Sequence, residues 1–426
     1  MTALGAPPAP SVLRRRREAA VPAALVSLAL LGVNALAYVF TVGAARLLAP
    51  EAYGELAALL GVMFIGVVPA TGLQTAAALK LGKSLPEERP LLLARLHAAT
   101  WVGAGAVGVL GLLAVGPLVS LLHLSGPATV LWLIAVLVPH TLVGGYDGLL
   151  QGTRRYGRLA FVNSTFGVLK SGGGIAGLLI GGTPEAALIG MALGCVASAA
   201  VGWLVSGRPG MARGMRTHML GAARASSALL GLVLLVNLDL LLARHHLSPE
   251  LAGEYAVASI FAKVAFWLPQ GVSVVLLPRL AYQRARRRVL PVAVALVAFV
   301  GAVLTAITAV LGARALTLVG GAEYGTALGG ATWAFAMLGT LFALAQLLLY
   351  SGIAAADRIA AVAVWCAVAL EAIAVEVLAA GAGLTVLTVA WIALGTSILL
   401  VGTGLLRLWL AHKGDVVLEP AGSPAR

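Results

Sequence analysis

Long apolar runs separated by short polar stretches make up most of the chain. A helix needs about 20 mostly apolar residues to cross a bilayer, and the chain holds twelve such runs, six in each half. They lie at about 21–45, 54–79, 96–121, 128–150, 158–181, 185–206, 222–243, 253–277, 289–312, 328–350, 359–380 and 384–406. The connections between them are too short to hold a soluble catalytic domain. The pattern predicts an all-α integral membrane protein with about twelve transmembrane helices.

An internal repeat divides these spans into two equal sets. Residues 50–57 and residues 249–256 both read P-E-x-x-G-E-x-A, and each copy follows an Ala-Arg pair that ends at Arg46 or at Arg244. Because each unit has an even number of spans, the second copy enters the membrane from the same side as the first. The two copies are then related by an axis along the membrane normal. We predict two parallel, pseudo-symmetric six-helix bundles with a central cleft between them. The first covers 1–210 with a basic tail at 1–20, and the second covers 211–426 with a tail at 407–426.

Composition and charge agree with this topology. Hydrophobic residues make up 60% of the chain and charged residues 11%, far from the composition of a soluble enzyme. The net charge of +13 comes from 29 Lys and Arg against 16 Asp and Glu. With the N-terminus in the cytoplasm, only Arg46, Arg244 and Arg314 lie on the outer side, and Lys170 and Lys263 lie within spans. This positive-inside pattern predicts that both termini are cytoplasmic. The basic surplus then faces anionic membrane lipids, and no nucleic-acid partner is expected.

Two lysines lie at mid-depth in predicted spans, one in each half. A charge at the centre of a span costs about 2.5–3.5 kcal/mol on insertion scales, so such residues are expected to face a cavity or a partner. Lys170 lies in the fifth span and Lys263 in the eighth, and Asn163 shares a helix face with Lys170. In a water-filled cleft the two ammonium groups would bind a phosphate or diphosphate. The alternative is that each lysine pairs with a carboxylate such as Glu371 and only holds helices together.

Carboxylates inside the spans are candidates for ion coupling. Asp239 lies in the outer part of the seventh span and Glu371 near mid-depth in the eleventh, where desolvation would favour binding of a proton or Na⁺. For Asp239 the alternative is an ion pair with Arg46 or Arg244 at the outer boundary. Glu371 and Glu376 are about 140° apart around a helix and do not form an acid–base pair. No cofactor is expected apart from a coupling ion, H⁺ or Na⁺.

Proline and glycine mark points of bending and of close packing. Pro69 and Gly72 in the second span, and Pro269 and Gly271 in the eighth, can bend a helix. We interpret these positions as hinges, with static kinks as the alternative. A small-xxx-small stripe at residues 173–181 of the fifth span favours close contact with another helix.

Signatures of enzymes and of metal sites are not found in the sequence. There is no Walker loop, no H-E-x-x-H motif and no clustered Cys/His site. The pair His245-His246 is predicted to have no third ligand nearby, so we interpret it as part of a solvated outer loop. Neither a metal site nor an enzymatic activity is predicted.

Several stretches resemble signatures of the bacterial polysaccharide (oligosaccharide) flippases. Residues 45–54 are similar to that family's first loop, and residues 237–244, 247–250 and 253–255 are similar to the region joining its seventh and eighth spans. Residues 277–280 resemble the close of the eighth span, and residues 150–152 with Arg158 resemble the loop after the fourth. The family belongs to the superfamily that also holds the lipid II flippases and the multidrug and toxic compound extrusion (MATE) transporters. The resemblance implies a V-shaped, MATE-like pair of bundles in which cationic cavity residues hold a diphosphate.

The repeat, the topology, the mid-membrane lysines and this resemblance together predict a flippase of the bacterial inner membrane. The resemblance implies that an undecaprenyl-diphosphate-linked glycan moves from the cytoplasmic to the outer leaflet by alternating access, for polysaccharide biosynthesis. The predicted substrate-binding residues are Lys170, Lys263, Asn163 and Arg46, with an outer gate as a second role for Arg46. Glycan polymerase and glycosyltransferases are the expected protein partners. The first alternative is a cation-coupled multidrug exporter of the same fold; an integral-membrane glycosyl- or acyltransferase and a non-transporting scaffold are the others.

Overall fold

Helices are the regular elements throughout the part of the chain that the computed structural model describes, namely residues 32–214, 216–268, 283–324, 328, 330–354, 357–381 and 383–417. The first half contains a helix over Gly32–Leu47, called here the first helix, and then α2 (Pro50–Gly66), α3 (Val68–Lys83), α4 (Arg89–Leu121), α5 (Pro127–Gly152), α6 (Tyr156–Gly181) and α7 (Pro184–Val205). The second half contains α8 (Arg216–His246), α9 (Pro249–Trp267), α11 (Gln283–Leu311), α12 (Arg314–Gly320), α13 (Thr332–Ala354), α14 (Arg358–Gly381) and α15 (Val386–Val417).

Each predicted span corresponds to a helix, and the chain is a multi-pass membrane protein. Within the described residues, nine helical segments are long and apolar enough to cross a bilayer, with the continuous segment Pro50–Lys83 counted as one. α6 and α9, which carry the two mid-span lysines, are long enough but more polar than those nine. α4 and α11 are the third long helix of their halves. In each of them, only 17% of the residues in the most apolar 18-residue stretch are buried within the protein. Apolar surface of this extent is expected to face lipid.

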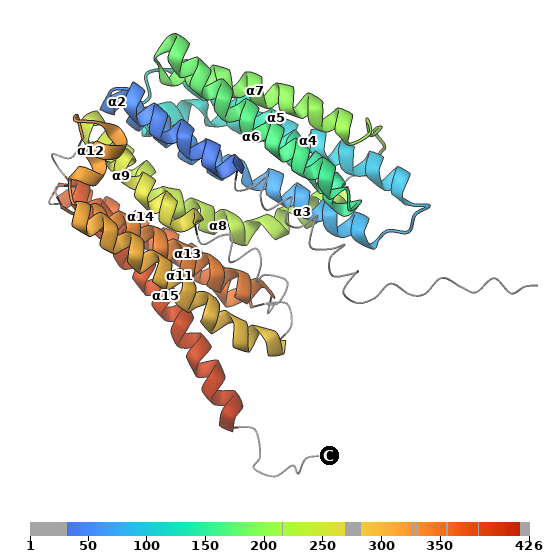
Figure 1. Ribbon diagram of the computed structural model, residues 1–426. Helices are drawn as coiled ribbons and strands as arrows, with labels where there is room; N and C mark the ends of the chain where they lie inside the picture. The colour runs from blue at the N-terminus through green and yellow to red at the C-terminus, as the bar shows by residue number, and fades with distance from the viewer. Residues whose placement is uncertain are drawn as a thin grey trace, which may run out of the picture.

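The helices form two groups joined by α2, α8 and α9. Helices α3 to α7 pack on one another in the first half, and α11, α13, α14 and α15 do so in the second. α2 packs against α8 and α9, and α3 packs against α8, so these pairs connect the halves. In Figure 1 the two groups form a V, close together where α2 and α9 begin and apart toward the ends of α3 and α15. The division into domains at 210/211 stays a prediction.

The two copies of the repeat motif meet at the closed end of the V, called here the motif end. α2 begins at Pro50 and α9 at Pro249, and proline suits a first helical turn because the N–H it lacks would have no partner there. The two helices cross where Gly54 meets Gly253. A Cβ atom on Gly253 would lie 2.1 Å from the carbonyl oxygen of Pro50, so the crossing requires a residue without a side chain.

The glutamate that follows each of these glycines anchors a loop of its own half. Glu55 accepts a hydrogen bond of 2.8 Å from the hydroxyl of Ser125, in the loop after α4. Glu254 accepts one of 2.8 Å from the backbone N–H of Leu328, in the loop after α12. Both carboxylates are buried, and buried carboxylates need such donors. The repeat therefore has a packing role through its glycines and an anchoring role through its glutamates.

Candidate functional site

Lys170 and Lys263 come from opposite halves of the chain, yet they line one cavity. Lys170 lies on α6 and Lys263 on α9, and the cavity between them has a volume of about 130 Å³. The first helix, α2 and α7 supply the remaining walls, with Asn34, Tyr38 and Thr41 among the other polar side chains. Both lysines are half-buried, so each ammonium group is partly withdrawn from solvent. The cavity is therefore a space between the halves with mostly apolar walls, into which two ammonium groups and a few other polar side chains are set.

Each of these ammonium groups lies over an aromatic ring. Lys170 Nζ is 5.0 Å from the ring centroid of Phe166, and Lys263 Nζ is 5.8 Å from that of Phe64. Among the described residues, neither group has a carboxylate within the 4.0 Å of an ion pair. Asp239 acts on Lys263 electrostatically from farther away. A cation–π contact compensates only part of the lost hydration, so both ammonium groups are available to an anionic ligand.

Asn163 lies on α6 but is not part of the cavity lining. Its Nδ2 donates a hydrogen bond of 3.1 Å to the carbonyl oxygen of Leu159, and its side chain lies next to the buried carboxyl group of Asp147 on α5. Seven residues of helix separate Asn163 from Lys170 by about 10 Å along the axis. Residues on the same helix face thus lie at different depths, and a substrate contact for Asn163 stays a prediction.

A second polar cluster lies inside the C-terminal half. Asp239 on α8 accepts a hydrogen bond of 2.8 Å from the hydroxyl of Tyr255, and Glu371 on α14 accepts one of 3.1 Å from Thr396 on α15. All four residues are buried, and the two carboxyl groups interact electrostatically. Glu371 Oε1 and Asn237 Oδ1 are buried and have no hydrogen-bond partner. Buried oxygens without partners are costly, and a bound proton or cation would remove that cost.

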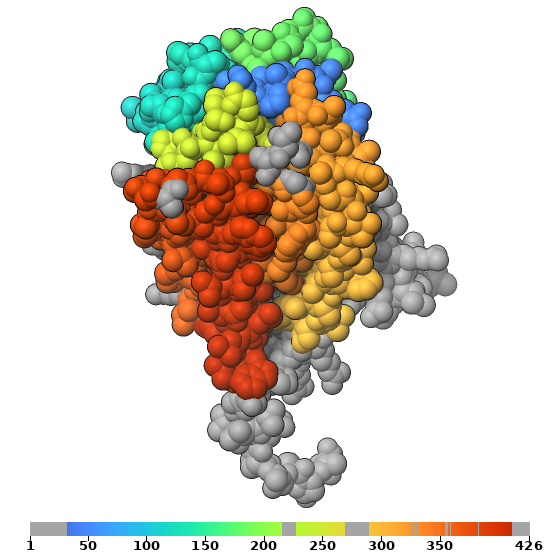
Figure 2. All heavy atoms as spheres, turned by 90° about the vertical axis from the view of Figure 1, so that its left-hand side faces the viewer, coloured from blue at the N-terminus to red at the C-terminus, as the bar shows by residue number. Residues whose placement is uncertain are grey.

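Two arginines join the halves at the motif end, and both belong to the Ala-Arg pairs of the repeat. Arg46, from the first half, donates to the backbone carbonyl oxygens of residues 318–319 at the end of α12. Arg244, from the second half, donates to those of residues 122–123 after α4, at 2.9 and 3.1 Å. Carbonyl groups at a helix C-terminus lack intrahelical partners and carry the negative end of the helix dipole, so they suit a guanidinium. Figure 2 views this end, where helices of the first half (blue to green) lie directly against those of the second (yellow to red).

The two arginine contacts are reciprocal between the halves, and neither arginine forms an ion pair with Asp239. The contacts would have to break for the motif end to open. A substrate-binding role for Arg46 stays a prediction, because the hydrogen bonds of its guanidinium go to the protein backbone.

We expect Arg244→Ala to open the motif end more than Arg46→Ala. Arg244 is 5% exposed whereas Arg46 is exposed, and hydrogen bonds from a charged group are worth about 1.5–3 kcal/mol when buried. Thr41→Cys, in a chain without the native cysteines, places a thiol in the cavity wall. Labelling by a membrane-impermeant maleimide from the predicted outer side should be faster in the Arg244→Ala protein. Arg314→Ala, which removes an exposed arginine of α12, should leave the rate unchanged. Equal rates in all variants would contradict a gate at this position.

The predicted hinge at Pro69 lies next to a break between α2 and α3. α2 ends at Gly66 and α3 begins at Val68. Proline has no N–H for the carbonyl group four residues earlier, and its ring crowds that group, so the helix is interrupted in the preceding turn. Gly72 is buried in α3. Pro269 and Gly271 lie outside the described residues, and hinge movement stays a prediction at all four positions.

A larger cavity of about 550 Å³ lies between α13, α14 and α15. Its walls are mostly aliphatic, and at one end Arg407 forms an ion pair of 3.0 Å with Asp357. Neither mid-span lysine lines it. Both cavities have mostly apolar walls, but the two lysines line the smaller one, so the smaller cavity is the candidate for phosphate recognition.

Solved structures that resemble this one identify the fold. The lipid II flippase MurJ in an inward closed conformation aligns with a TM-score of 0.67 over 91% of this chain and 87% of that one, at 15% identity. An inward-facing multidrug resistance MATE family transporter aligns with a TM-score of 0.67 over 88% of this chain and 95% of that one, at 13% identity. The chain has the fold of the MOP exporter superfamily. A MOP superfamily transporter from Pyrococcus furiosus, whose binding pocket has reversed polarity, gives a TM-score of 0.62 over 91% and 95% of the two chains, at 11% identity. No protein-family model matches the sequence, and no curated protein matches it.

The MOP fold confirms the predicted fold class of an all-α, MATE-like membrane protein. The structural neighbours are transporters and flippases rather than enzymes. Similarity at these identities shows the fold alone, so the substrate has to be argued from the side chains of this chain.

Proposed function

We propose that this MOP-fold protein is a flippase that moves a polyprenyl-diphosphate-linked oligosaccharide from the cytoplasmic to the outer leaflet. The observation that carries the proposal is the pair Lys170 and Lys263, which opposite halves contribute to one cavity. A diphosphate can contact two separate ammonium groups at once, whereas a cationic drug would be repelled by both. The MurJ neighbour, itself described as a lipid II flippase, supports a lipid-linked substrate.

Alternating access is the mechanism that this arrangement supports. Because the two lysines belong to different halves, movement of one half against the other changes the distance between them and therefore the affinity for a diphosphate. The arginine contacts at the motif end are formed in the present state and would be broken in the opposite one. The charge distribution supports a bacterial inner membrane location with both termini in the cytoplasm. Glycan polymerase and glycosyltransferases remain the partner classes proposed for cell-surface polysaccharide synthesis.

Reconstitution tests the proposal directly. The purified chain is placed in vesicles that contain a fluorescent polyprenyl-diphosphate sugar, and a membrane-impermeant quencher reports the fraction of label in the outer leaflet. We expect flipping that depends on the protein and is inhibited by a water-soluble diphosphate sugar. A lipid monophosphate without sugar serves as the control substrate. Absence of protein-dependent flipping across several glycans and ion gradients would overturn the proposal.

We further propose that the cluster of Asp239, Tyr255, Glu371 and Thr396 binds the coupling ion, H⁺ or Na⁺. Two buried carboxyl groups and the unpartnered Glu371 Oε1 supply oxygen atoms of the kind that a proton or a small hard cation requires. The cluster connects α8, α9, α14 and α15, and Asp239 also acts electrostatically on Lys263. Occupation of the ion site would therefore alter the charge that a substrate meets in the cavity.

Glu371→Gln is expected to remove the dependence of transport on an ion gradient. The amide keeps the size of the side chain but cannot bind a proton and offers a cation only one oxygen. Flipping is measured with and without imposed H⁺ and Na⁺ gradients in the vesicle assay. Glu87→Gln, which changes an exposed carboxylate in the loop after α3, is the matched control and should retain the response. A Glu371→Gln protein that still responds to the gradients would contradict this role.

A cation-coupled multidrug exporter is the second candidate, because the MATE transporter aligns as well as MurJ, with a TM-score of 0.67 for each. Such a protein would protect cells against cationic drugs and would not need the two lysines. Drug sensitivity of a deletion strain, complemented with the wild-type chain or with Lys170→Ala, separates the two candidates. Protection that survives loss of the lysine would favour the exporter.

A further inference from the structure

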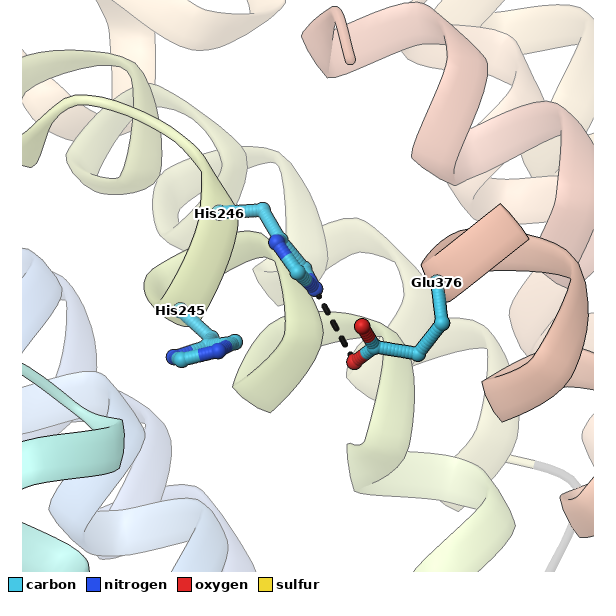
Figure 3. Close-up of side chains that lie close together, drawn as sticks. All are labelled: His245, His246 and Glu376. Atoms are coloured by element: carbon cyan, nitrogen blue, oxygen red, sulfur yellow. Dashed lines mark hydrogen bonds and ion pairs between the residues drawn. The ribbon is translucent and has the colours of Figure 1, made fainter. Parts of the chain in front are cut away.

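Three metal-ligating side chains meet at the motif end, outside the lysine cavity and outside the proposed ion site. His245 and His246 form the last turn of α8, and Glu376 projects from α14. One potential ligand atom from each residue lies within 4.8 Å of the other two. Figure 3 shows the Glu376 carboxylate reaching His246 while His245 lies beside them. The third ligand is more than 100 positions away in the sequence, so the tertiary structure creates this cluster.

The hydrogen bonds of the cluster leave it suited to a metal ion. His246 Nε2 lies 3.1 Å from Glu376 Oε1, close to the spacing of about 3.4 Å between neighbouring ligands in a tetrahedral zinc site with bonds near 2.1 Å. His245 Nδ1 lies 2.6 Å from the carbonyl oxygen of Leu121. A histidine ligand typically donates its second ring N–H to such a carbonyl, which fixes the tautomer and turns the other nitrogen toward the metal.

We propose that His245, His246 and Glu376 bind a divalent transition-metal ion of the zinc class at the motif end. Two imidazoles and one carboxylate are a typical protein ligand set for Zn²⁺, and a water molecule would complete the tetrahedron. His245 and His246 are half-buried and Glu376 is exposed, which provides an entry path and room for that water. Hard cations such as Mg²⁺ prefer oxygen-only sites and are not expected here.

The position of the site gives it a structural consequence. His245 directly follows Arg244, and its ring stacks on that of His123 from the first half, with centroids 5.5 Å apart. A bound metal would link the end of α8 to α14. At the same end of α8, Arg244 donates hydrogen bonds to the carbonyl groups after α4. Binding is therefore expected to be tighter in the state in which the motif end is closed.

Isothermal titration of Zn²⁺ into the purified full-length chain, prepared with a histidine-free tag, tests the site. We expect one equivalent to bind to the wild-type protein. His246→Ala and Glu376→Gln each remove a direct ligand, so affinity should fall by more than the roughly 10–100-fold that loss of a supporting partner costs. Glu323→Gln, which changes an exposed carboxylate in the loop after α12, should bind as tightly as wild type. Mg²⁺ should produce no binding signal under the same conditions.

Two outcomes would overturn the proposal. One is a wild-type protein that binds no Zn²⁺, which would leave His246 and Glu376 as a simple hydrogen-bonded pair. The other is equal binding by the wild-type, His246→Ala and Glu376→Gln proteins, which would show that Zn²⁺ binds elsewhere. Thermal unfolding of the metal-free variants verifies that they are folded. If His246→Ala is unstable, Glu376→Gln still tests the site, because Glu376 is exposed and its change to Gln should not disturb the fold. Co²⁺ substitution adds an independent measure, because visible d–d bands report tetrahedral nitrogen and oxygen ligation.

Discussion

Lys170→Ala and Lys263→Ala are each expected to reduce flipping of a lipid-linked diphosphate sugar by about 10- to 100-fold at subsaturating substrate. A hydrogen bond from a charged group contributes about 1.5–3 kcal/mol, and 1.4 kcal/mol corresponds to a tenfold change. The double variant should lose protein-dependent flipping altogether, because among the described residues no other basic side chain lines this cavity. Flipping rates in reconstituted vesicles, compared at equal protein density, measure the effect.

Stability separates this binding role from a structural one. Within the described structure neither ammonium group pairs with a carboxylate, so its removal should leave thermal unfolding unchanged or raise the midpoint. Lys83→Ala, at the exposed end of α3, is the matched control and should retain full flipping. Variants that flip normally would contradict the proposed diphosphate contact. Variants that lose flipping together with their fold would indicate a structural role instead.

Gly253→Ala is expected to be the most damaging single-methyl change at the interface between the halves. The new Cβ would lie 2.1 Å from the carbonyl oxygen and 2.5 Å from the carbonyl carbon of Pro50, and these backbone atoms move only if α2 and α9 separate. Overpacking of this kind costs about 1–3 kcal/mol. Thermal unfolding in detergent should show the loss, and the cavity thiol described above should label faster from the outer side.

A graded series distinguishes a clash from a general intolerance of alanine. At Gly54 the added Cβ would lie 3.0 Å from the backbone nitrogen of Gly253, so Gly54→Ala should be milder than Gly253→Ala. For Gly105 in α4, no described atom outside the neighbouring backbone of its own helix lies within 4 Å of the added position. Gly105→Ala should therefore be neutral or stabilising, because alanine favours helix over glycine by about 1 kcal/mol. A series in which all three variants behave alike would contradict the close crossing.

The parts of the fold that depend on local composition could be predicted well. The twelve spans follow from hydropathy, and each has a helix in the structure. The small-residue stripe at 173–181 predicted a close helix contact, and α6 does pack closely on α7, where a Cβ on Gly177 would lie 2.0 Å from the carbonyl oxygen of Ala186. The identity of that partner helix could not be predicted, because a small side chain permits contact from any neighbour of suitable shape.

Several features of the sites could not be predicted, because they join residues that are distant in sequence. The sequence predicts that Arg46 serves as an outer gate or an anion contact. It does not show the backbone partners at residues 318–319, because they belong to α12, a short helix outside the span pattern. The sequence predicts that His245 and His246 lie in a loop. They instead complete the last turn of α8, where Glu376 becomes their neighbour.

The sequence by itself determined the all-α membrane fold class and the repeated motif, and it predicts the number of spans and their alternation across the membrane. Those properties follow from the transfer free energy of each segment and from the charges that flank it, which are local quantities. Only the tertiary structure decided that Lys170 and Lys263 share a cavity, that the Ala-Arg pairs contact opposite halves, and that Glu376 joins the histidines. These outcomes depend on where helices cross, and the crossing point is set by side-chain volumes on both helices together, as at Gly54 and Gly253.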